Sequence, residues 1–289
     1  MTLGELLACP VCHGTLDDLA CPRCARTYAR ERGVPDLTPV PPPHAEVQDR
    51  WQLWEALQAN GEQAYEIDPP SSLSVGERDD ARAFAAFAQL EGRVLDVGCG
   101  PQALPSYAAG MAGELVGIDP LTGTQPRDFT FVKGIAEYLP FADASFDRVL
   151  FATSLDHVLS PSLTVAEARR VTRPGGAVVV WLGEQGPAPS LRDRAAMAAR
   201  MLRRGEFGGV AERARAALRG KAAAAAPVTV TVQTPAATMT FDVPEGAIDA
   251  FHVAHPDAGT ISGWLRDAGL TIEAVERPLP GHCFIRARP

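Results

Sequence analysis

The chain has 289 residues, enough for one α/β domain with a small appendage and a sizeable core. Hydrophobic residues make up 46% and charged residues 21%, and no apolar run approaches the roughly 20 residues that cross a bilayer. The formal net charge of −8 lacks the basic footprint of most nucleic-acid-binding proteins. It favours a small-molecule partner; a local basic patch that binds nucleic acid is the alternative.

The N-terminus does not resemble a signal peptide, because residues 1–7 include Glu5 and have no basic start. We therefore expect a cytoplasmic protein without a membrane anchor. Oligomeric state is not predictable from these residues.

Four of the six cysteines form two C-x2-C pairs, Cys9 with Cys12 and Cys21 with Cys24. In a chain with no export signal, such clustered thiolates are typical of a metal site rather than of disulfides. Two pairs complete a tetrahedral set of four sulfurs, which predicts structural Zn²⁺ with no open position for catalysis. A redox dithiol and chance clustering are the alternatives.

The apolar residues around these cysteines are too few for a free-standing core, so a metal would supply much of the folding free energy. The stretch Leu7-Ala-Cys-Pro-Val-Cys-His-Gly-Thr-Leu16, with Tyr28 and Gly33-Val-Pro-Asp-Leu37, resembles the zinc-ribbon family of small activators of tRNA and protein methyltransferases. Such ribbons also precede methyltransferase domains, including those of bacterial rRNA guanine methyltransferases. The resemblance defines a first domain at residues 1–38.

Five prolines between residues 35 and 43 predict an extended linker. After it, Val47, Trp51, Trp54 and Leu57 recur at helical spacing. The helix could be ordinary packing, or a lid in which Trp51, Trp54 or Tyr65 touches substrate. We assign residues 39–80 to this linker and lid helix, and expect a second helix over residues 77–90 that leads into the main domain, residues 81–289.

The most informative stretch is Arg93-Val-Leu-Asp-Val-Gly-Cys-Gly-Pro101. A short strand at residues 94–97 ends in glycines and is expected to feed a helix that begins near residues 104–107. Gly98 and Gly100 let backbone amides approach a ligand closely, and a helix N-terminus would favour its carboxylate.

A second strand, Leu115-Val-Gly-Ile-Asp119, ends in an acid about twenty residues later. Such a carboxylate can accept hydrogen bonds from both hydroxyls of a ribose. Because NAD-binding proteins share this geometry, the two glycines alone do not separate the two ligand classes. Ala103 stands where a dinucleotide fingerprint has its third glycine.

Three later blocks separate them: Phe131-Val-Lys-Gly-Ile-Ala-Glu-Tyr-Leu-Pro-Phe141, Ser145-Phe-Asp-Arg-Val-Leu-Phe151 and Glu167-Ala-Arg-Arg-Val-Thr-Arg-Pro-Gly-Gly-Ala-Val-Val-Val-Trp181. Over about residues 80–182 the chain resembles class I S-adenosylmethionine (SAM) dependent methyltransferases, specifically those that act on small molecules. The resemblance implies an α/β fold with a doubly wound, mostly parallel, seven-stranded Rossmann-like sheet.

The resemblance also implies roles for individual residues. Asp96, Gly98, Cys99 and Gly100 would line the methionine end of SAM; Asp119 would hold the ribose; Pro120 would flank the adenine; Ala136 and Glu137 would reach the adenine edge; and Ala152, Thr153 and Ser154 would face the sulfonium. Two departures stand out, Gln102 for a common glycine and Ile135 for an aspartate that usually bonds the adenine amino group. Cys99 and Cys283 are also expected to be buried small hydrophobes.

Methyl transfer needs an aligned nucleophile and, for some acceptors, a base. Asp156 and His157 follow the strand that begins at Arg148, where an open parallel sheet places its ligands. His157 is the leading candidate base; packing against SAM or capping a helix is the alternative.

A second cluster contains His252 and His255, three residues apart, which could hold one metal, although no third ligand is evident. In related methyltransferases a histidine just before the helix at residues 260–268 borders the substrate site. This resemblance makes His255 a candidate substrate contact; a histidine without a role is the alternative.

Residues 184–250 read as a capping insertion in the main domain. Residues 189–226 suggest two Ala- and Arg-rich helices, while residues 228–233 and 238–243 alternate with period two as in a hairpin. Residues 270–277 and 282–288 are expected to form the antiparallel pair that ends the sheet.

These observations favour SAM-dependent O- or N-methylation of a small molecule such as a sugar, polyketide or peptide-derived natural product. An rRNA or tRNA base methyltransferase, favoured by the ribbon, is the first alternative. A non-catalytic zinc-ribbon adaptor is the second.

Overall fold

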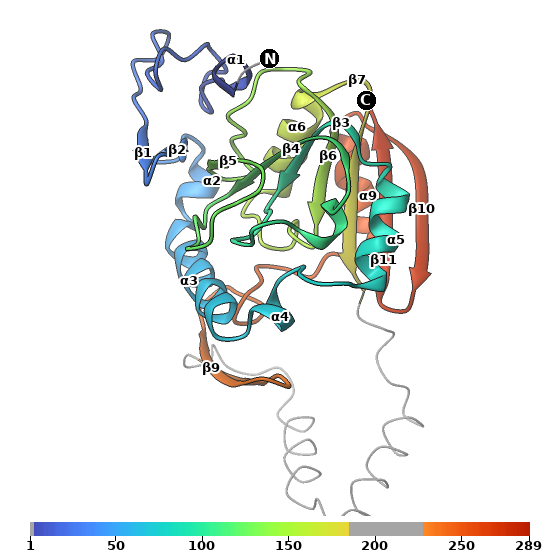
Figure 1. The fold of residues 1–289 in the computed structure, drawn as a ribbon. Helices are drawn as coiled ribbons and strands as arrows, with labels where there is room; N and C mark the ends of the chain where they lie inside the picture. Colours follow the sequence, from blue (N-terminus) through green and yellow to red (C-terminus); the bar gives the residue numbers. More distant parts are fainter. Residues whose placement is uncertain (1–2, 185–227) are drawn as a thin grey trace, which may run out of the picture. The chain divides into compact units, whose positions relative to one another are not determined.

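The computed structural model describes residues 3–184 and 228–289, and Met1–Glu184 and Thr229–Pro289 form one compact unit (Figure 1). Among the described residues, nine strands form one sheet in the order β1-β2-β5-β4-β3-β6-β7-β11-β10, and β8 and β9 form a separate hairpin. The strands of the large sheet are β1 Ala29–Glu31, β2 Val34–Asp36, β3 Glu91–Val97, β4 Ala112–Asp119, β5 Thr130–Lys133, β6 Phe146–Ala152, β7 Thr172–Gly183, β10 Thr271–Leu279 and β11 His282–Arg288.

Five neighbouring strands, β5, β4, β3, β6 and β7, run parallel. Strand β11 pairs antiparallel with both β7 and β10, as predicted for the end of the chain. The order reverses at β3, which lies between β4 and β6. This confirms a Rossmann-like, mostly parallel sheet and places the switch point at the carboxyl ends of β3 and β6.

The predicted count of seven strands is wrong for the sheet as a whole, because β1 and β2 from the cysteine-rich segment extend it to nine. Strand β5 would otherwise be an edge with unpaired backbone groups. Strand β2 pairs with it in parallel at Asp36 and Lys133, and the Leu37 N–H donates to the Lys133 carbonyl at 2.8 Å. The Lys133 ammonium also contacts Glu31 at 2.6 Å and Asp36 at 3.1 Å.

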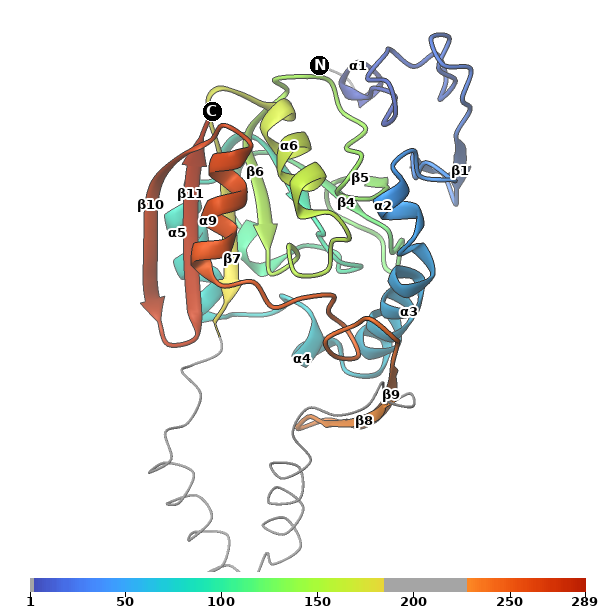
Figure 2. The same ribbon diagram turned by 180° about the vertical axis from the view of Figure 1, so that it is seen from behind.

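The helices lie on both faces of the sheet. Figure 2 shows α6 and α9 on one face, with α5 behind the sheet on the other. The helices are α1 Leu3–Leu6, α2 Ala45–Gln48, α3 Trp51–Ile67, α4 Pro69–Ser72, α5 Asp79–Ala88, α6 Pro161–Val171 and α9 Ala258–Asp267, with the 3₁₀ turn η1 Ser106–Ala108. None of the helices within the described residues combines the length and apolar composition that a bilayer span requires.

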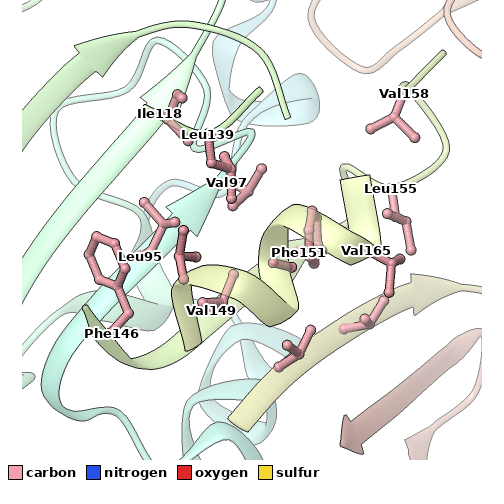
Figure 3. Close-up of a cluster of buried hydrophobic side chains, with 14 of the residues drawn as sticks. Leu95, Val97, Ile118, Leu139, Phe146, Val149, Phe151, Leu155, Val158 and Val165 are labelled. Carbon is pink, nitrogen blue, oxygen red and sulfur yellow. The ribbon is translucent and has the colours of Figure 1, made fainter. Parts of the chain in front are cut away.

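Two apolar layers follow from the alternation of side chains along each strand. Leu95, Val97, Val149 and Phe151 face α6 and α9, whereas Val94 and Leu150 belong to a second cluster that packs against α5. Figure 3 shows the first layer, with Val165 of α6 among the strand residues. Burial on both faces explains why the central strands are almost continuously hydrophobic.

The helix expected to begin near residues 104–107 does not form; only the turn η1 occupies that stretch. Pro105 disfavours helical geometry at the residue before it, and Gly110 follows with a left-handed φ of +75°. Too few residues remain between them for an α-helix. The turn after β3 therefore has no long helix N-terminus for a ligand carboxylate.

The cysteine-rich segment packs against its own main domain. Leu6, Leu7 and Leu19 are buried in the same core as the central strands. The Ala8 N–H donates to the Pro140 carbonyl at 3.0 Å, and the Ala142 N–H to the Leu6 carbonyl at 2.9 Å. The apolar residues that are too few for a core of their own thus extend an existing one.

Helices α3 and α4 lie beyond the carboxyl ends of the parallel strands (Figure 1). The hairpin predicted in the insertion is confirmed as β8 Val228–Gln233 and β9 Thr238–Val243. It packs on α3 through a small apolar cluster, and Asn60 of α3 donates to the carbonyls of Asp242 and Ala250 at 2.9 and 2.8 Å. The helices expected within residues 189–226 lie outside the described residues.

Candidate cofactor and substrate site

Asp96 lies near the end of β3 with its side chain completely buried. The Tyr107 hydroxyl donates to its Oδ2 at 2.7 Å, while its Oδ1 is buried without a partner. Burial raises the pKa of Asp96 to about 7, although the hydrogen bond from Tyr107 opposes this shift. A buried acceptor left without a donor is costly and suits a polar group supplied by a ligand.

Gly98 follows β3 with a φ of +76°. A Cβ atom there would lie 2.4 Å from the Cβ of Ser154, so only glycine fits between the two strand ends. The Ser154 hydroxyl donates to the Val97 carbonyl at 2.5 Å and ties the end of β6 to that of β3. Thr153 takes a left-handed φ of +57°, and its N–H donates to the Trp181 carbonyl at 2.9 Å.

Asp119 ends β4 and is nearly completely buried. Its Oδ2 accepts from the Gly100 N–H and its Oδ1 from the Leu121 N–H, both at 2.8 Å. Burial raises its pKa, opposed by these two amide donors and by the Arg127 guanidinium. Each carboxylate oxygen keeps a second lone pair for a further donor such as a ribose hydroxyl.

The sequence patterns did not single out Arg127, which lies between β4 and β5 and donates hydrogen bonds to the turn after β3. Its Nη2 donates to the carbonyls of Gly100 and Leu121 at 3.0 Å each, and its guanidinium lies 3.5 Å from the centre of the Phe131 ring. Arg127 thereby holds the chain on both sides of Asp119. No short-range pattern in the sequence marks it, because its partners are backbone carbonyls.

Glu137, which is predicted to reach the adenine edge, has a buried carboxylate that already accepts hydrogen bonds from the backbone. Oε1 of Glu137 accepts from the N–H groups of Leu159 and Ser160 at 2.6 and 3.1 Å, so the side chain anchors the loop before α6. Ile135, one of the two departures from the family pattern, packs in an apolar cluster with Val47. Contacts of Pro120, Ala136 and Glu137 with an adenine stay a prediction. Backbone atoms would make most of these contacts.

The loop after β6 brings Asp156 and His157 to the predicted place. Nδ1 of His157 lies 3.0 Å from the Phe251 carbonyl, and its Nε2 lies 3.6 Å from Oδ1 of Asp156. A nitrogen that faces a carbonyl must carry its proton, which leaves the lone pair on Nε2. The tautomer suits a base, but the catalytic role of His157 stays a prediction.

His255 lies in a histidine stack rather than alone. Its ring centre is 4.8 Å from that of His252, which in turn lies 4.5 Å from that of His157. Nε2 of His255 contacts Oδ2 of Asp249 at 2.8 Å. The sequence gives no signal for the meeting of His157 and His252, which are far apart in the chain. A substrate contact for His255 stays a prediction.

Burial raises the pKa of Tyr65 in α3, and the carboxylates of Asp119 and Asp156 add to this shift. The rings of Trp51 and Trp54 are tilted by 31° at a centroid distance of 4.7 Å, and both residues pack against the buried cluster around Tyr138. The two tryptophans proposed for a lid thus contribute packing, and contact of Tyr65 with substrate stays a prediction.

The four N-terminal cysteines converge, with their sulfur atoms all within 4.8 Å of one another. The Cys9 and Cys24 sulfurs are 3.6 Å apart, and those of Cys12 and Cys21 are 3.4 Å apart. Around a tetrahedral zinc ion with bonds of about 2.3 Å, sulfurs are expected about 3.8 Å apart. The set therefore fits a zinc ion. Cys99 and Cys283 are buried, as expected.

SAM carries an ammonium and a ribose diol, and acceptor groups at the ends of β3 and β4 fit these two groups. Oδ1 of Asp96 is an unpartnered buried acceptor, as is Oε1 of the buried Gln102 in the same turn. Asp119 retains acceptor capacity next to them, on the neighbouring strand.

Residues 95–180 match the protein family described as "Methyltransferase domain". An uncharacterized methyltransferase of Mycolicibacterium gilvum is 39% identical over 129 residues, 40% of this chain and 51% of the relative. A fatty-acid O-methyltransferase of Mycolicibacterium smegmatis is 34% identical over 131 residues, 39% of this chain and 48% of the relative. The chain thus spans about half the length of these curated relatives.

Among solved structures, the fold is similar to the 1,6-didemethyltoxoflavin-N1-methyltransferase of Burkholderia thailandensis, which was crystallised with 1,6-didemethyltoxoflavin and S-adenosylhomocysteine. The TM-score is 0.50 at 13% identity, over 90% of this chain and 98% of that one, which is a likeness of fold. The family match over residues 95–180 and the Rossmann-like sheet thus agree with a methyltransferase domain in this part of the chain.

Proposed function

We propose that this protein transfers the methyl group of SAM to an oxygen or nitrogen atom of a small-molecule acceptor. The observation that carries the proposal is the meeting of two buried carboxylates, Asp96 and Asp119, at the adjacent carboxyl ends of β3 and β4. One has an unpartnered oxygen, and the other shares its oxygens with the turn at Gly100. This is the set of acceptors that the ammonium and the ribose of SAM require.

When bound, SAM supplies an electrophilic methyl group. In the proposed reaction Asp96 and Asp119 orient the cofactor, and the backbone of residues 152–154 borders the reacting carbon. The acceptor is held in line with that carbon, since alignment is the main contribution of such an enzyme. Nε2 of His157 is the proposed proton acceptor, because Nδ1 donates to the Phe251 carbonyl.

The small-molecule class rests on three observations of different kinds. The net charge is −8, one relative is named a fatty-acid O-methyltransferase, and the hairpin of the insertion packs on α3 beyond the strand ends. A sugar, a polyketide or a peptide-derived metabolite is the acceptor class that we propose.

An RNA base methyltransferase is the second candidate, favoured by the cysteine-rich ribbon. Its basic residues Arg23, Arg26, Arg30 and Arg32 are offset by Asp17, Asp18 and Glu31. Arg30 pairs with Asp18, and Arg32 donates to the Gly123 carbonyl, so part of this positive charge is already engaged.

Calorimetry with S-adenosylhomocysteine tests the cofactor, and methyl transfer from isotope-labelled SAM tests the activity. Transfer to a metabolite extract that changes little between 50 and 200 mM salt supports the proposal. Activity only on RNA, with a steep fall over the same range, would establish the second candidate. Absence of cofactor binding in a folded chain would leave only the non-catalytic adaptor.

A further inference from the structure

Asp156, His157 and His252 meet beyond the carboxyl end of β6, and we call them the histidine–carboxylate cluster. Their ligand atoms, one from each residue, all lie within 4.8 Å of one another. Nε2 of His157 is 3.6 Å from Oδ1 of Asp156, and Nε2 of His252 is 3.7 Å from Oδ2. These separations are too long for hydrogen bonds. They are close to the ~3.4 Å expected between ligands of a tetrahedral ion with bonds of about 2.0–2.1 Å.

The opposite nitrogen of each ring has its own acceptor. Nδ1 of His157 is 3.0 Å from the Phe251 carbonyl, and Nδ1 of His252 is 2.9 Å from both oxygens of Asp249. In the neutral tautomer that these contacts favour, each Nδ1 carries the proton and each Nε2 lone pair faces Asp156. Metal-binding histidines are held in this way, by a carbonyl or a carboxylate on the far nitrogen.

Asp156 contributes an independent observation. Its Oδ1 atom is buried and has no hydrogen-bond partner. Nε2 of His157 faces this oxygen, and Nε2 of His252 faces the other oxygen, Oδ2. Among the described residues, no hydrogen-bond donor reaches Oδ1. A cation at this point would satisfy Oδ1 and both Nε2 atoms.

A second set, Asp249 with His252 and His255, competes for the same ion. Asp249 is already committed there: its Oδ1 accepts from the N–H groups of Phe251 and His252, and its Oδ2 contacts Nε2 of His255 at 2.8 Å. His252 can present only one nitrogen to an ion while the other stays bonded to Asp249. The free nitrogen is the one that faces Asp156, so the first set is favoured.

We propose that the histidine–carboxylate cluster binds one divalent transition-metal ion, such as Zn²⁺ or Co²⁺, through Asp156, His157 and His252. Two imidazoles and one carboxylate suit these ions better than Mg²⁺ or Ca²⁺, which prefer all-oxygen sets. Three protein ligands leave a coordination position open to an exogenous oxygen or nitrogen. The loop that carries Asp156 also carries Ser154, whose hydroxyl donates to the Val97 carbonyl at the end of β3, so the ion would border the proposed cofactor site.

The inference does not depend on methyl transfer, but it bears on the base proposed above. The Nε2 lone pair of His157 can take a proton or bind a metal, not both at once. With the ion in place, His157 is a ligand, and the open coordination position would orient the acceptor.

The test is a calorimetric and spectroscopic titration with Co²⁺ of the full chain, without a polyhistidine tag and with the ribbon cysteines loaded with zinc. We expect one Co²⁺ per chain with visible bands of nitrogen and oxygen ligands, and no thiolate charge-transfer band. His157→Ala and His252→Ala should each weaken binding at least ~10-fold, more than a supporting residue would.

His255→Ala is the matched control, because it removes a histidine of the same stack that belongs only to the competing set. It should bind Co²⁺ as the parent chain does. Asp156→Asn is an isosteric change of the third ligand and should also weaken Co²⁺ binding. Thermal melting identifies any variant that is unfolded.

Unchanged binding in folded His157→Ala, an equal loss in His255→Ala, or no binding by the parent chain overturns the proposal. Titration of the same samples with S-adenosylhomocysteine separates the two hypotheses. Metal binding without cofactor binding would overturn the proposed function but support the proposed metal site.

Discussion

The Tyr107 hydroxyl lies 2.7 Å from Oδ2 of Asp96 and donates a hydrogen bond to it, so that Oδ1 alone has no partner. The carboxylate is completely buried between the sheet and the turn η1. A carboxylate held in this way affects the stability of the chain without cofactor and the affinity of the chain for a positively charged ligand group.

Asp96 makes stability depend on pH with a defined sign. Its folded pKa is raised to about 7 by burial, above the unfolded value of about 3.9. The folded chain therefore binds the proton more tightly, and this contribution to stability is present below about pH 4 and lost as the pH rises through 7.

Asp96→Asn removes this titration at nearly constant shape. Without cofactor, we expect the melting temperature of the variant minus that of the parent chain to be larger at pH 8 than at pH 5. Asp128→Asn, an exposed position in the connection after β4, is the control and should leave the pH profile unchanged. Parallel profiles for Asp96→Asn and the parent would disprove the raised pKa.

Asp119→Ala should weaken binding of S-adenosylhomocysteine roughly 30-fold, equivalent to about 2 kcal/mol, as for the loss of a hydrogen bond to a charged group. The physical reason is that both ribose hydroxyls would lose their acceptor. Calorimetry is the measurement, with Asp128→Ala as control. Equal affinities in the two folded variants would rule out a role of Asp119 in cofactor binding.

Gly98→Ala tests the close approach of β3 and β6 through two separable effects. The left-handed φ costs an alanine about 1–2 kcal/mol. The contact with Ser154 adds about 1–3 kcal/mol, because a Cβ would lie 2.4 Å from a side-chain carbon.

Gly110→Ala is the matched control, since Gly110 has nearly the same φ of +75° and nothing within 4 Å of its would-be Cβ. Denaturant unfolding should therefore show a larger loss for Gly98→Ala than for Gly110→Ala. The same loss in both variants would mean that Ser154 yields without cost.

The cysteine cluster predicts one zinc ion per chain bound by thiolates. Cys21→Ser should remove it and destabilise the chain by several kcal/mol, since binding free energy at such sites is folding free energy. The loss should reach the main domain, because Leu6 and Leu7 lie in its core. Metal analysis by mass spectrometry and thermal melting measure the two effects.

Cys283→Ala is the comparison for this experiment, because it removes a buried cysteine far from the cluster. It should keep the zinc and lose only packing. A folded Cys21→Ser chain with a full zinc complement would contradict the assignment of the four ligands.

Much of the main domain was predictable because its signals are local. The hydrophobic strands around Asp96 and Asp119, the helix over residues 77–90 and the final antiparallel pair all follow from patterns of a few residues. The helix expected after Gly100 was predicted wrongly, because Pro105 and Gly110 leave too few residues between them for an α-helix.

The tertiary contacts of these residues were not predictable in the same way. Nothing near His157 in the sequence indicates that His252 will stack on it, and nothing near Arg127 indicates that it will hold the Gly100 turn. The count of strands failed for the same reason, since the pairing of Asp36 with Lys133 joins two segments by backbone hydrogen bonds that any residues could make.

The sequence by itself determined the chemistry of the individual positions: thiolates at a metal-binding spacing, glycines at a tight turn, and acids at strand ends. These properties depend on residue type and on neighbours within one turn of chain. Only the tertiary structure decided which oxygen of Asp96 lacks a donor and which nitrogens face Asp156. Those depend on burial and on side-chain direction, and both are set by segments that are distant in the chain.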